Sequence, residues 1–141
     1  MTQVAPIRAT PIRVFLVDDQ TLVRQGIRSL LALAEGIDVV AEASDGRQAV
    51  EQIPQVAPDV VLMDMRMPVM SGLESLQAMS RAGTLPPTII LTTFDDDALV
   101  LAGIKAGAKG YLLKDVSLEQ LVNAIQMVAA GGSLVQPAVT Q

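Results

Sequence analysis

The central part of the sequence contains an apolar run, Val60-Val61-Leu62-Met63, that stops at Asp64 and continues as Met65-Arg66-Met67-Pro68. A short apolar run that ends at a charged residue is typical of a buried strand. The same arrangement recurs elsewhere, so the run at 60–63 belongs to a series. Its other members are Ile12–Val17 before Asp18-Asp19, Thr88–Leu91 before Thr92-Thr93, and Gly110–Leu113 before Lys114.

Helical patterns fill the intervals between these runs. Apolar residues recur at helical spacing within 22–31, 49–53, 73–79, 99–106 and 118–128. We expect Pro54 to end the second of these helices and Gly107 to follow the end of the fourth. One further run, Ile37–Ala43, is interrupted by Asp38 and Glu42, as suits an edge strand. Five strands in strict alternation with five helices predict a doubly wound α/β fold, in which helices cover both faces of a parallel sheet.

The composition excludes several classes of protein. The 141 residues include no His and no Cys, which removes Ser-His-Asp catalysis, phosphohistidine on this chain, disulfides and typical zinc sites. A net charge of −5 without any Lys or Arg run argues against a nucleic-acid surface. No apolar stretch approaches the roughly 20 residues of a membrane helix, and the start has no signal-peptide pattern. We therefore expect a cytoplasmic single domain without membrane contact.

Polar groups end four of the predicted strands, namely Asp18-Asp19, Asp64, Thr92 and Lys114. Any one of them alone is as readily a loop cap, but the carboxyl ends of parallel strands share one edge, so we expect all four to converge. Crowded carboxylates repel one another, and an all-oxygen ligand set favours Mg²⁺ or Mn²⁺. An Asp carboxylate can attack phosphorus, while an ammonium and a hydroxyl stabilise the transferring group. The pattern predicts a phosphoryl-acceptor site.

Four motifs together resemble the receiver domain of bacterial two-component response regulators. They are Val17-Asp18-Asp19-Gln20, Leu62–Pro68 with Gly72, Leu91-Thr92-Thr93, and Tyr111-Leu112-Leu113-Lys114-Asp115. The match runs from Ile12 to Gly132, and the combination of motifs is highly specific. It implies a flavodoxin-like sheet in the order 2-1-3-4-5. It also implies a flexible N-terminal arm over 1–11, a receiver domain over 12–132, and from 133–141 the start of a linker to an output domain that this chain lacks.

The resemblance gives each polar residue at this edge a role. Asp64 would be the phosphoacceptor. The metal ligands would be Asp18, Asp19, Asp64 and the backbone carbonyl of Arg66, with Mg²⁺ as the cofactor and Mn²⁺ as an alternative. The residues that bind the phosphoryl group or switch with it would be Thr92, Thr93, Lys114 and Tyr111, with Thr92 as the switch hydroxyl and Tyr111 as the switch aromatic.

Residues 92–97 and 112–115 resemble the NarL/FixJ subfamily, whose members carry a C-terminal helix-turn-helix domain that binds DNA. This likeness implies a switch rather than an enzyme. A sensor histidine kinase or a small phosphodonor would phosphorylate it, it would dephosphorylate itself slowly, and it would homodimerise and regulate transcription through the absent domain. The alternative is a stand-alone receiver or phosphate sink. A haloacid-dehalogenase-type phosphatase is disfavoured, because that class needs an acid where Arg66 stands.

Some features depart from the commonest receiver pattern or allow a plainer interpretation. Asp115 stands where many receivers have a proline, which puts the usual cis peptide bond in doubt, and Thr93 replaces a smaller residue. We interpret residues 95–97 as caps of a helix N-terminus rather than as a metal site. The methionines at 63, 65, 67 and 70 are interpreted as core and loop residues, and Asp45-Gly46 as the turn that opens a helix.

Overall fold

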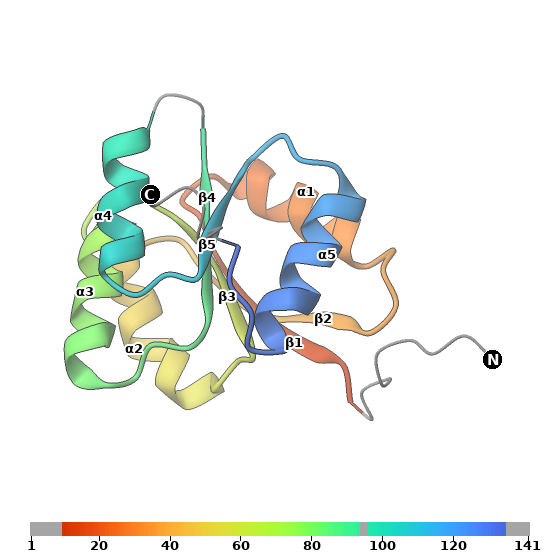
Figure 1. Cartoon of the computed structure of the whole chain (residues 1–141), viewed down its shortest axis with the longest axis horizontal. Coiled ribbons are helices and arrows are strands. Elements are labelled where there is room, and N and C mark those ends of the chain that lie inside the picture. Colours follow the sequence, from red (N-terminus) through yellow and green to blue (C-terminus); the bar gives the residue numbers. More distant parts are fainter. Residues whose placement is uncertain (1–9, 94–95, 135–141) are drawn as a thin grey trace.

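The computed structural model describes residues 10–93 and 96–134. Most of the predicted N-terminal arm (1–11) and most of the predicted linker start (133–141) lie outside these residues, as do Phe94 and Asp95. Within the described part, strands and helices alternate along the chain. Figure 1 shows a central sheet with helices on both sides.

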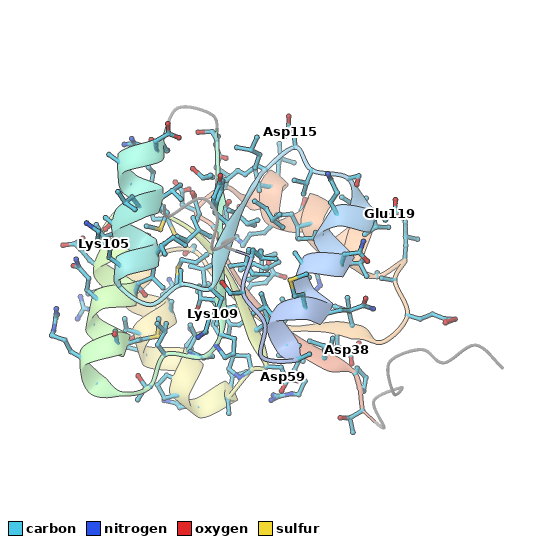
Figure 2. All side chains as sticks on the ribbon, viewed as in Figure 1. Asp38, Asp59, Lys105, Lys109, Asp115 and Glu119 are labelled. Carbon is cyan, nitrogen blue, oxygen red and sulfur yellow. The ribbon has the colours of Figure 1, made fainter. Side chains whose placement is uncertain are left out.

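Five parallel strands form one sheet in the order β2-β1-β3-β4-β5 (Figure 1). They are β1 (Ile12–Val17), β2 (Ile37–Ala43), β3 (Val60–Asp64), β4 (Thr88–Thr92) and β5 (Gly110–Leu113). This order confirms the doubly wound, flavodoxin-like fold and places β2 at an edge, as its interrupted pattern predicted. Asp115 lies at the end of the sheet where the strands finish, whereas Asp38 and Asp59 lie at the opposite end (Figure 2).

Helices cover both faces of the sheet (Figure 1). One face carries α1 (Thr21–Leu31) and α5 (Leu118–Ala129), and the other carries α2 (Gly46–Val56), α3 (Gly72–Ala82) and α4 (Asp97–Lys105). Alternate residues of a strand point to opposite faces. On β1, Val14 and Leu16 therefore pack beneath α1 and α5, whereas Phe15 and Val17 pack beneath α2 and α3. None of the helices in the described part is long and apolar enough to cross a membrane.

Three of the described helices begin with a side-chain cap. Asp45 accepts a hydrogen bond from the backbone of Gln48 at 2.9 Å and so opens α2, as the Asp45-Gly46 turn predicted. Ser71 and Ser117 open α3 and α5 with capping boxes. The starts of α1 and α4 have no such cap. Both of these starts lie at the carboxyl edge of the sheet, so other contacts must hold them there.

The predicted end of the second helix is wrong, because α2 continues past Pro54 to Val56. Pro54 lies in the last turn, where its missing N–H removes a single hydrogen bond of the helix. The N–H of Ala57 then donates to the carbonyl of Ile53 at 2.8 Å and closes that turn. The helix therefore continues through the proline and ends two residues after it.

Helix α4 approaches β4 closely at a glycine. Gly103 is its only buried residue, and a Cβ added there would lie 2.4 Å from Cδ1 of Ile90. The helix spans Asp97–Lys105 rather than the predicted 99–106, because the two residues before Leu99 already adopt helical geometry. Its apolar Leu101 is 56% exposed. Leu99 and Ile104 are only partly buried against the core, so α4 has no fully buried large apolar side chain.

The methionines in β3 and in the loop after it are core and loop residues, as predicted. Met63 and Met65 are buried, each in one of the clusters on the face that carries α2, α3 and α4. Met67 is partly buried against the same core, and the carbonyl of Met70 accepts a hydrogen bond from the N–H of Gly46 at 2.9 Å. Their role is packing.

After α5 the chain returns to the start of β5. The hydroxyl of Ser133 and the N–H of Leu134 both donate to the carbonyl of Lys109, at 2.9 and 2.8 Å. Leu134 packs against the core beneath α1 and α5 and lies directly over Gly110, where an added Cβ would be 2.3 Å from the Cβ of Leu134. The first two residues after Gly132 therefore contact the domain.

Candidate functional site

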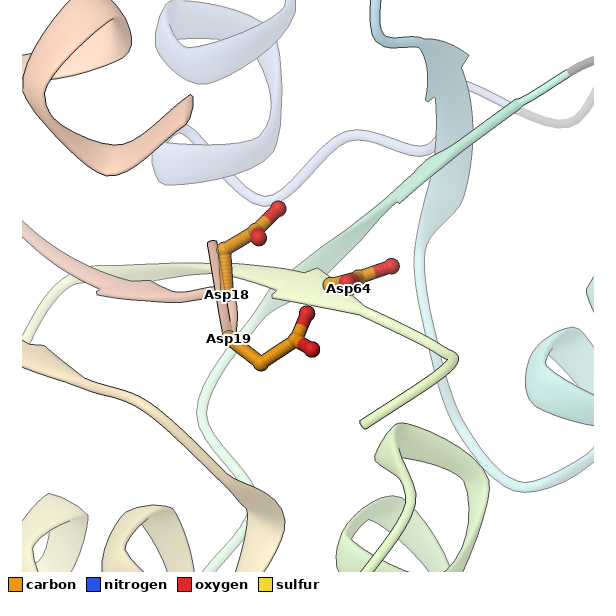
Figure 3. Close-up of side chains that lie close together, drawn as sticks. All are labelled: Asp18, Asp19 and Asp64. Atoms are coloured by element: carbon orange, nitrogen blue, oxygen red, sulfur yellow. The ribbon is translucent and has the colours of Figure 1, made fainter. Parts of the chain in front are cut away.

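Three carboxylates meet where β1 and β3 end. Asp18 and Asp19 follow β1 directly, Asp64 is the last residue of β3, and these two strands are hydrogen-bonded neighbours. Each residue offers one carboxylate oxygen, and the three oxygens lie within 4.8 Å of one another (Figure 3). Asp18 and Asp64 are buried and Asp19 is exposed. The cluster therefore opens to solvent on the side of Asp19.

Lys114 brings an ammonium group to the same cluster from the end of β5. Its Nζ lies 3.0 Å from Oδ2 of Asp18 and 3.3 Å from Oδ2 of Asp64. The N–H of Lys114 donates to the carbonyl of Thr92 at 2.8 Å, which ties the end of β5 to the end of β4. The peptide bond to Asp115 is trans, like every other bond in the described part. The predicted convergence of strand ends thus holds for the three carboxylates and the lysine.

Burial and mutual repulsion change the acidity of these groups. Burial, and then the negative charge of Asp18, raise the pKa of Asp64 to about 6, although Lys114 acts in the opposite direction. Burial lowers the pKa of Lys114, but its hydrogen bonds and ion pairs with Asp18 and Asp64 outweigh that effect, so its pKa lies above the ordinary value. The lysine is therefore charged at neutral pH, while burial and the nearby Asp18 disfavour the charged form of Asp64.

This cluster has the properties of a divalent-cation site. Within the described residues, three carboxylates face the single ammonium of Lys114. Apart from that ammonium, the buried Oδ2 of Asp18 has no hydrogen-bond partner in the described structure. All the available ligands are oxygen atoms, which suits a hard cation such as Mg²⁺. A bound cation would thus offset the excess negative charge of the three carboxylates.

The remaining predicted residues lie beside the cluster rather than in it. Thr92 is the buried last residue of β4, and its hydroxyl donates to the carbonyl of Thr93 at 3.1 Å. The side chain of Thr93 is exposed. Tyr111 lies on β5 opposite Ile90 of β4 and is 49% exposed. The hydroxyl and the aromatic ring are therefore on adjacent strands. In the described part of the chain, neither forms a hydrogen bond with the three clustered carboxylates.

Arg66 directs its side chain away from the cluster. Its backbone N–H donates to Oδ1 of Asp64 at 3.4 Å, while its guanidinium binds both carboxylate oxygens of Asp96, at 3.1 and 2.5 Å. Asp96 occupies the N-cap position of α4, yet its side chain makes no capping hydrogen bond. The capping interpretation is therefore wrong for Asp96, because Arg66 competes for its carboxylate and lowers its pKa. Asp95 lies outside the described residues.

The loop after Asp64 is held close to the site by its backbone. A Cβ on Gly72 would lie 2.1 Å from the carbonyl oxygen of Asp64, so only glycine fits at the start of α3. Val69 has φ 68°, an unfavourable value for a β-branched residue, and the N–H of Met70 donates back to the carbonyl of Pro68 at 2.7 Å. This tight turn brings the chain around the edge of the site.

A family model described as the response regulator receiver domain matches residues 14–126 of the chain. The chain belongs to the response regulator receiver family. Receiver domains are phosphorylated by sensor histidine kinases and bind Mg²⁺ at an acidic pocket, and the Asp cluster gives this receiver such a pocket. The receiver is accordingly a signalling switch rather than an enzyme that turns over a substrate.

The receiver is similar to response regulators of the NarL and NarP type. The receiver is 46% identical over 133 residues to the nitrate/nitrite response regulator protein NarP of Escherichia coli, a match that covers 94% of this chain and 62% of that protein. It is 42% identical over 129 residues to the transcriptional regulatory protein LnrK of Bacillus subtilis, covering 92% and 59%. The signal receiver domain of NarL from Mycobacterium tuberculosis superimposes with a TM-score of 0.81 at 35% identity, covering 86% of this chain and 98% of that domain. The receiver thus spans about three fifths of the two curated relatives.

Two residues beside the site were not found from the sequence. Arg24, one turn into α1, donates to the backbone carbonyl of Asp18, and it also binds Glu42 of β2. Glu42 had been interpreted only as an interruption of an edge strand. An arginine one turn after an acidic pair, with an acid at the end of the adjacent strand, is a usable signal only when the strand order is known.

Proposed function

We propose that Asp64 accepts a phosphoryl group and that this event switches an attached output domain. One observation carries the proposal: the buried carboxylate of Asp64 lies with Asp18 and Asp19 and beside the ammonium of Lys114 at the strand ends. An oxygen of Asp64 would form a bond to phosphorus while the bond from phosphorus to the donor breaks, and the donor group leaves with its electron pair. Since the chain has no His, the donor is a partner histidine kinase or a small phosphodonor.

The surrounding residues would bind the metal and the phosphoryl group and neutralise the charge of the phosphoryl oxygens. Asp18, Asp19, Asp64 and the backbone carbonyl of Arg66 would hold Mg²⁺, or Mn²⁺ in its place, and the bound metal would supply positive charge to the phosphoryl oxygens. Lys114 would pair its ammonium with another of these oxygens. The hydroxyls of Thr92 and Thr93 would donate hydrogen bonds, once Thr92 leaves the carbonyl that it contacts now. Water would then hydrolyse the aspartyl-phosphate slowly.

We also infer that the whole protein carries a DNA-binding output domain after this receiver. Two observations support the inference. The receiver covers only 59% of LnrK and 62% of NarP, and LnrK is a transcriptional regulatory protein. Residues 12–132 would then form the receiver, 1–11 an N-terminal arm and 133–141 the start of the linker. Translation of the gene beyond Gln141 tests this directly, since a stop codon there would favour the stand-alone receiver instead.

Intact-mass spectrometry tests the phosphoacceptor. Incubation with acetyl phosphate or phosphoramidate and Mg²⁺ should add one phosphoryl group to the wild-type protein and none to Asp64→Asn. Asp38→Asn is the matched control, because Asp38 is an exposed aspartate at the opposite end of the sheet (Figure 2). It should label like the wild type. Labelling of Asp64→Asn at the wild-type rate would remove Asp64 as the acceptor.

The same assay tests the metal. EDTA should stop labelling of the wild type, and Asp19→Ala should label far more slowly at limiting Mg²⁺, because one carboxylate ligand is lost. Excess Mg²⁺ should partly restore labelling of Asp19→Ala but never of Asp64→Asn. Full labelling in the presence of chelator would take the metal out of the mechanism and leave Asp64 as the acceptor.

A further inference from the structure

Arg24 joins three elements beside the acidic cluster. Its guanidinium donates to the backbone carbonyl of Asp18 at 2.5 Å and to Oε1 of Glu42, on β2, at 3.2 Å. A longer contact of 3.4 Å reaches the hydroxyl of Thr21 at the start of α1. The Arg24 side chain is only 16% exposed. A guanidinium with several donors in a rigid fork is suited to hold such separate acceptors together.

The loop that Arg24 holds carries part of the acidic cluster. It consists of Asp18, Asp19 and Gln20, and it carries two of the three clustered carboxylates. Gln20 occupies the N-cap position of α1 but gives no side-chain cap, in contrast to the starts of α2, α3 and α5. Asp18 itself is held at three atoms besides its carbonyl. Its N–H donates to the carbonyl of Ala43 at 3.1 Å, Oδ1 accepts from the N–H of Gln20 at 2.9 Å, and Oδ2 pairs with Lys114 at 3.0 Å. The position of the exposed Asp19 therefore depends on the backbone.

We propose that Arg24 is a positioning residue that fixes the loop backbone so that Asp18 and Asp19 face Asp64 at the spacing a divalent cation requires. The proposal rests on the metal site of the proposed function. Arg24 contacts the main-chain carbonyl of Asp18 and not the clustered carboxylates. Glu42 binds the same guanidinium through another nitrogen. Groups that orient metal ligands commonly change the affinity for the metal by about 10- to 100-fold when they are removed.

A purely electrostatic role and a positioning role of Arg24 predict opposite changes in Mg²⁺ affinity when Arg24 is removed, so the two roles can be distinguished. If Arg24 acted only through its positive charge, its removal would strengthen the binding of a cation nearby. If it acts by positioning, its removal weakens that binding. Arg28 supplies a matched control, because it also pairs with Glu42 but makes no contact with Asp18 and is 56% exposed. Loss of Arg28 removes a similar charge and leaves the loop contact intact.

The experiment is calorimetric titration of Mg²⁺ into metal-free protein, without any phosphodonor, on wild type, Arg24→Ala, Arg24→Lys, Arg28→Ala and Asp19→Ala. We expect Arg24→Ala to bind Mg²⁺ about tenfold more weakly than wild type or worse, and Arg28→Ala to stay within about twofold, as a solvent-exposed charge should. Arg24→Lys should remain weakened, because an ammonium keeps the charge but not the fork. Thermal melting in EDTA checks that each variant is folded.

Equal affinities of Arg24→Ala and Arg28→Ala, or full recovery in Arg24→Lys, would overturn the positioning role and leave the metal site standing. A wild type that binds no Mg²⁺, or an Asp19→Ala variant that binds it like wild type, would instead overturn the metal site of the proposed function. If Arg24→Ala does not fold, Arg24→Lys carries the test alone, because it keeps the positive charge and loses the fork. It should bind Mg²⁺ more weakly than Arg28→Ala.

Discussion

Asp64 carries its negative charge in a buried position next to Asp18, and this raises its pKa to about 6. The ordinary value for an unfolded aspartate is about 3.9. Between these two values the folded protein binds more protons at Asp64 than the unfolded chain does, so the free energy of unfolding falls as the pH rises through about 4 to 6. In the absence of metal, the residue that is proposed to react is therefore one that destabilises the folded state at neutral pH.

Asp64→Asn should consequently stabilise the metal-free protein at pH 7.5, by about 1–2 kcal/mol once partial solvent screening is allowed for. The gain should shrink toward zero as the pH falls below about 4, where the wild-type aspartate is protonated in both states. Urea unfolding in EDTA at a series of pH values measures this difference. Asp38→Asn, at an exposed site, should stay within about 0.5 kcal/mol of wild type throughout. A destabilised Asp64→Asn, or a gain independent of pH, would contradict the account.

At the scale of secondary structure, α4 is the least securely attached helix in the described part of the chain. Gly103 is its only fully buried residue, Leu99 and Ile104 are partly buried, and it has no side-chain cap, whereas α5 has four buried residues and begins with a capping box. Its start is tied to the loop after β3 through the ion pair between Asp96 and Arg66. Elements with little buried apolar surface open most readily. Helix α4 is therefore the element whose position a change near Asp64 would shift with least resistance.

Hydrogen exchange followed by mass spectrometry tests this ranking. Peptides from α4 should exchange at least about tenfold faster than peptides from α5. Arg66→Ala should accelerate exchange in α4 by about two- to fivefold, as expected for one solvent-exposed ion pair, and leave α5 unchanged. Arg47→Ala is the control, because Arg47 pairs with Glu51 within α2 and bridges no elements. Equal protection of α4 and α5, or an equal effect of the two arginine variants on α4, would refute the proposed attachment.

The alternation of strands with helices and the convergence of strand ends could be predicted from local pattern and from the geometry of parallel sheets. The strand order was predicted only from the resemblance to receiver domains. Asp18, Asp64 and Lys114 each end an apolar run, and their meeting needs no knowledge of side-chain conformation. The partners of Arg24 and Arg66 could not be predicted in the same way. A long side chain reaches several acceptors, and the choice depends on tertiary distances that no single segment encodes. The capping error at Asp96 has this cause.

At the scale of the whole molecule, phosphorylation of Asp64 is expected to change self-association. The added phosphate would draw the Thr92 hydroxyl toward the site and free space for Tyr111 on the adjacent strand. Leu101 on α4 and Tyr111 on β5 are exposed. Helices α1 and α5, which are neighbours on one face of the sheet, are the expected dimer elements (Figure 1).

Sedimentation velocity with and without beryllofluoride, which mimics the phosphoryl group, measures the outcome. Wild-type protein with Mg²⁺ should shift from monomer toward dimer, and Asp64→Asn should not respond, because the mimic has no aspartate to bind. Thr92→Ala should respond more weakly than wild type. An unchanged wild-type mass would argue against dimerisation of this fragment. A response of Thr92→Ala equal to that of wild type would instead exclude the hydroxyl as the relay.

The contact between Leu134 and Gly110 has a consequence for how this sequence can change over generations. Because a Cβ at position 110 would overlap the Cβ of Leu134, a mutation that gives position 110 a side chain demands glycine at position 134 or a shift of the backbone there. The two changes would then arise as a linked pair, although 23 residues lie between them. In an alignment of its close relatives, positions 110 and 134 should therefore covary.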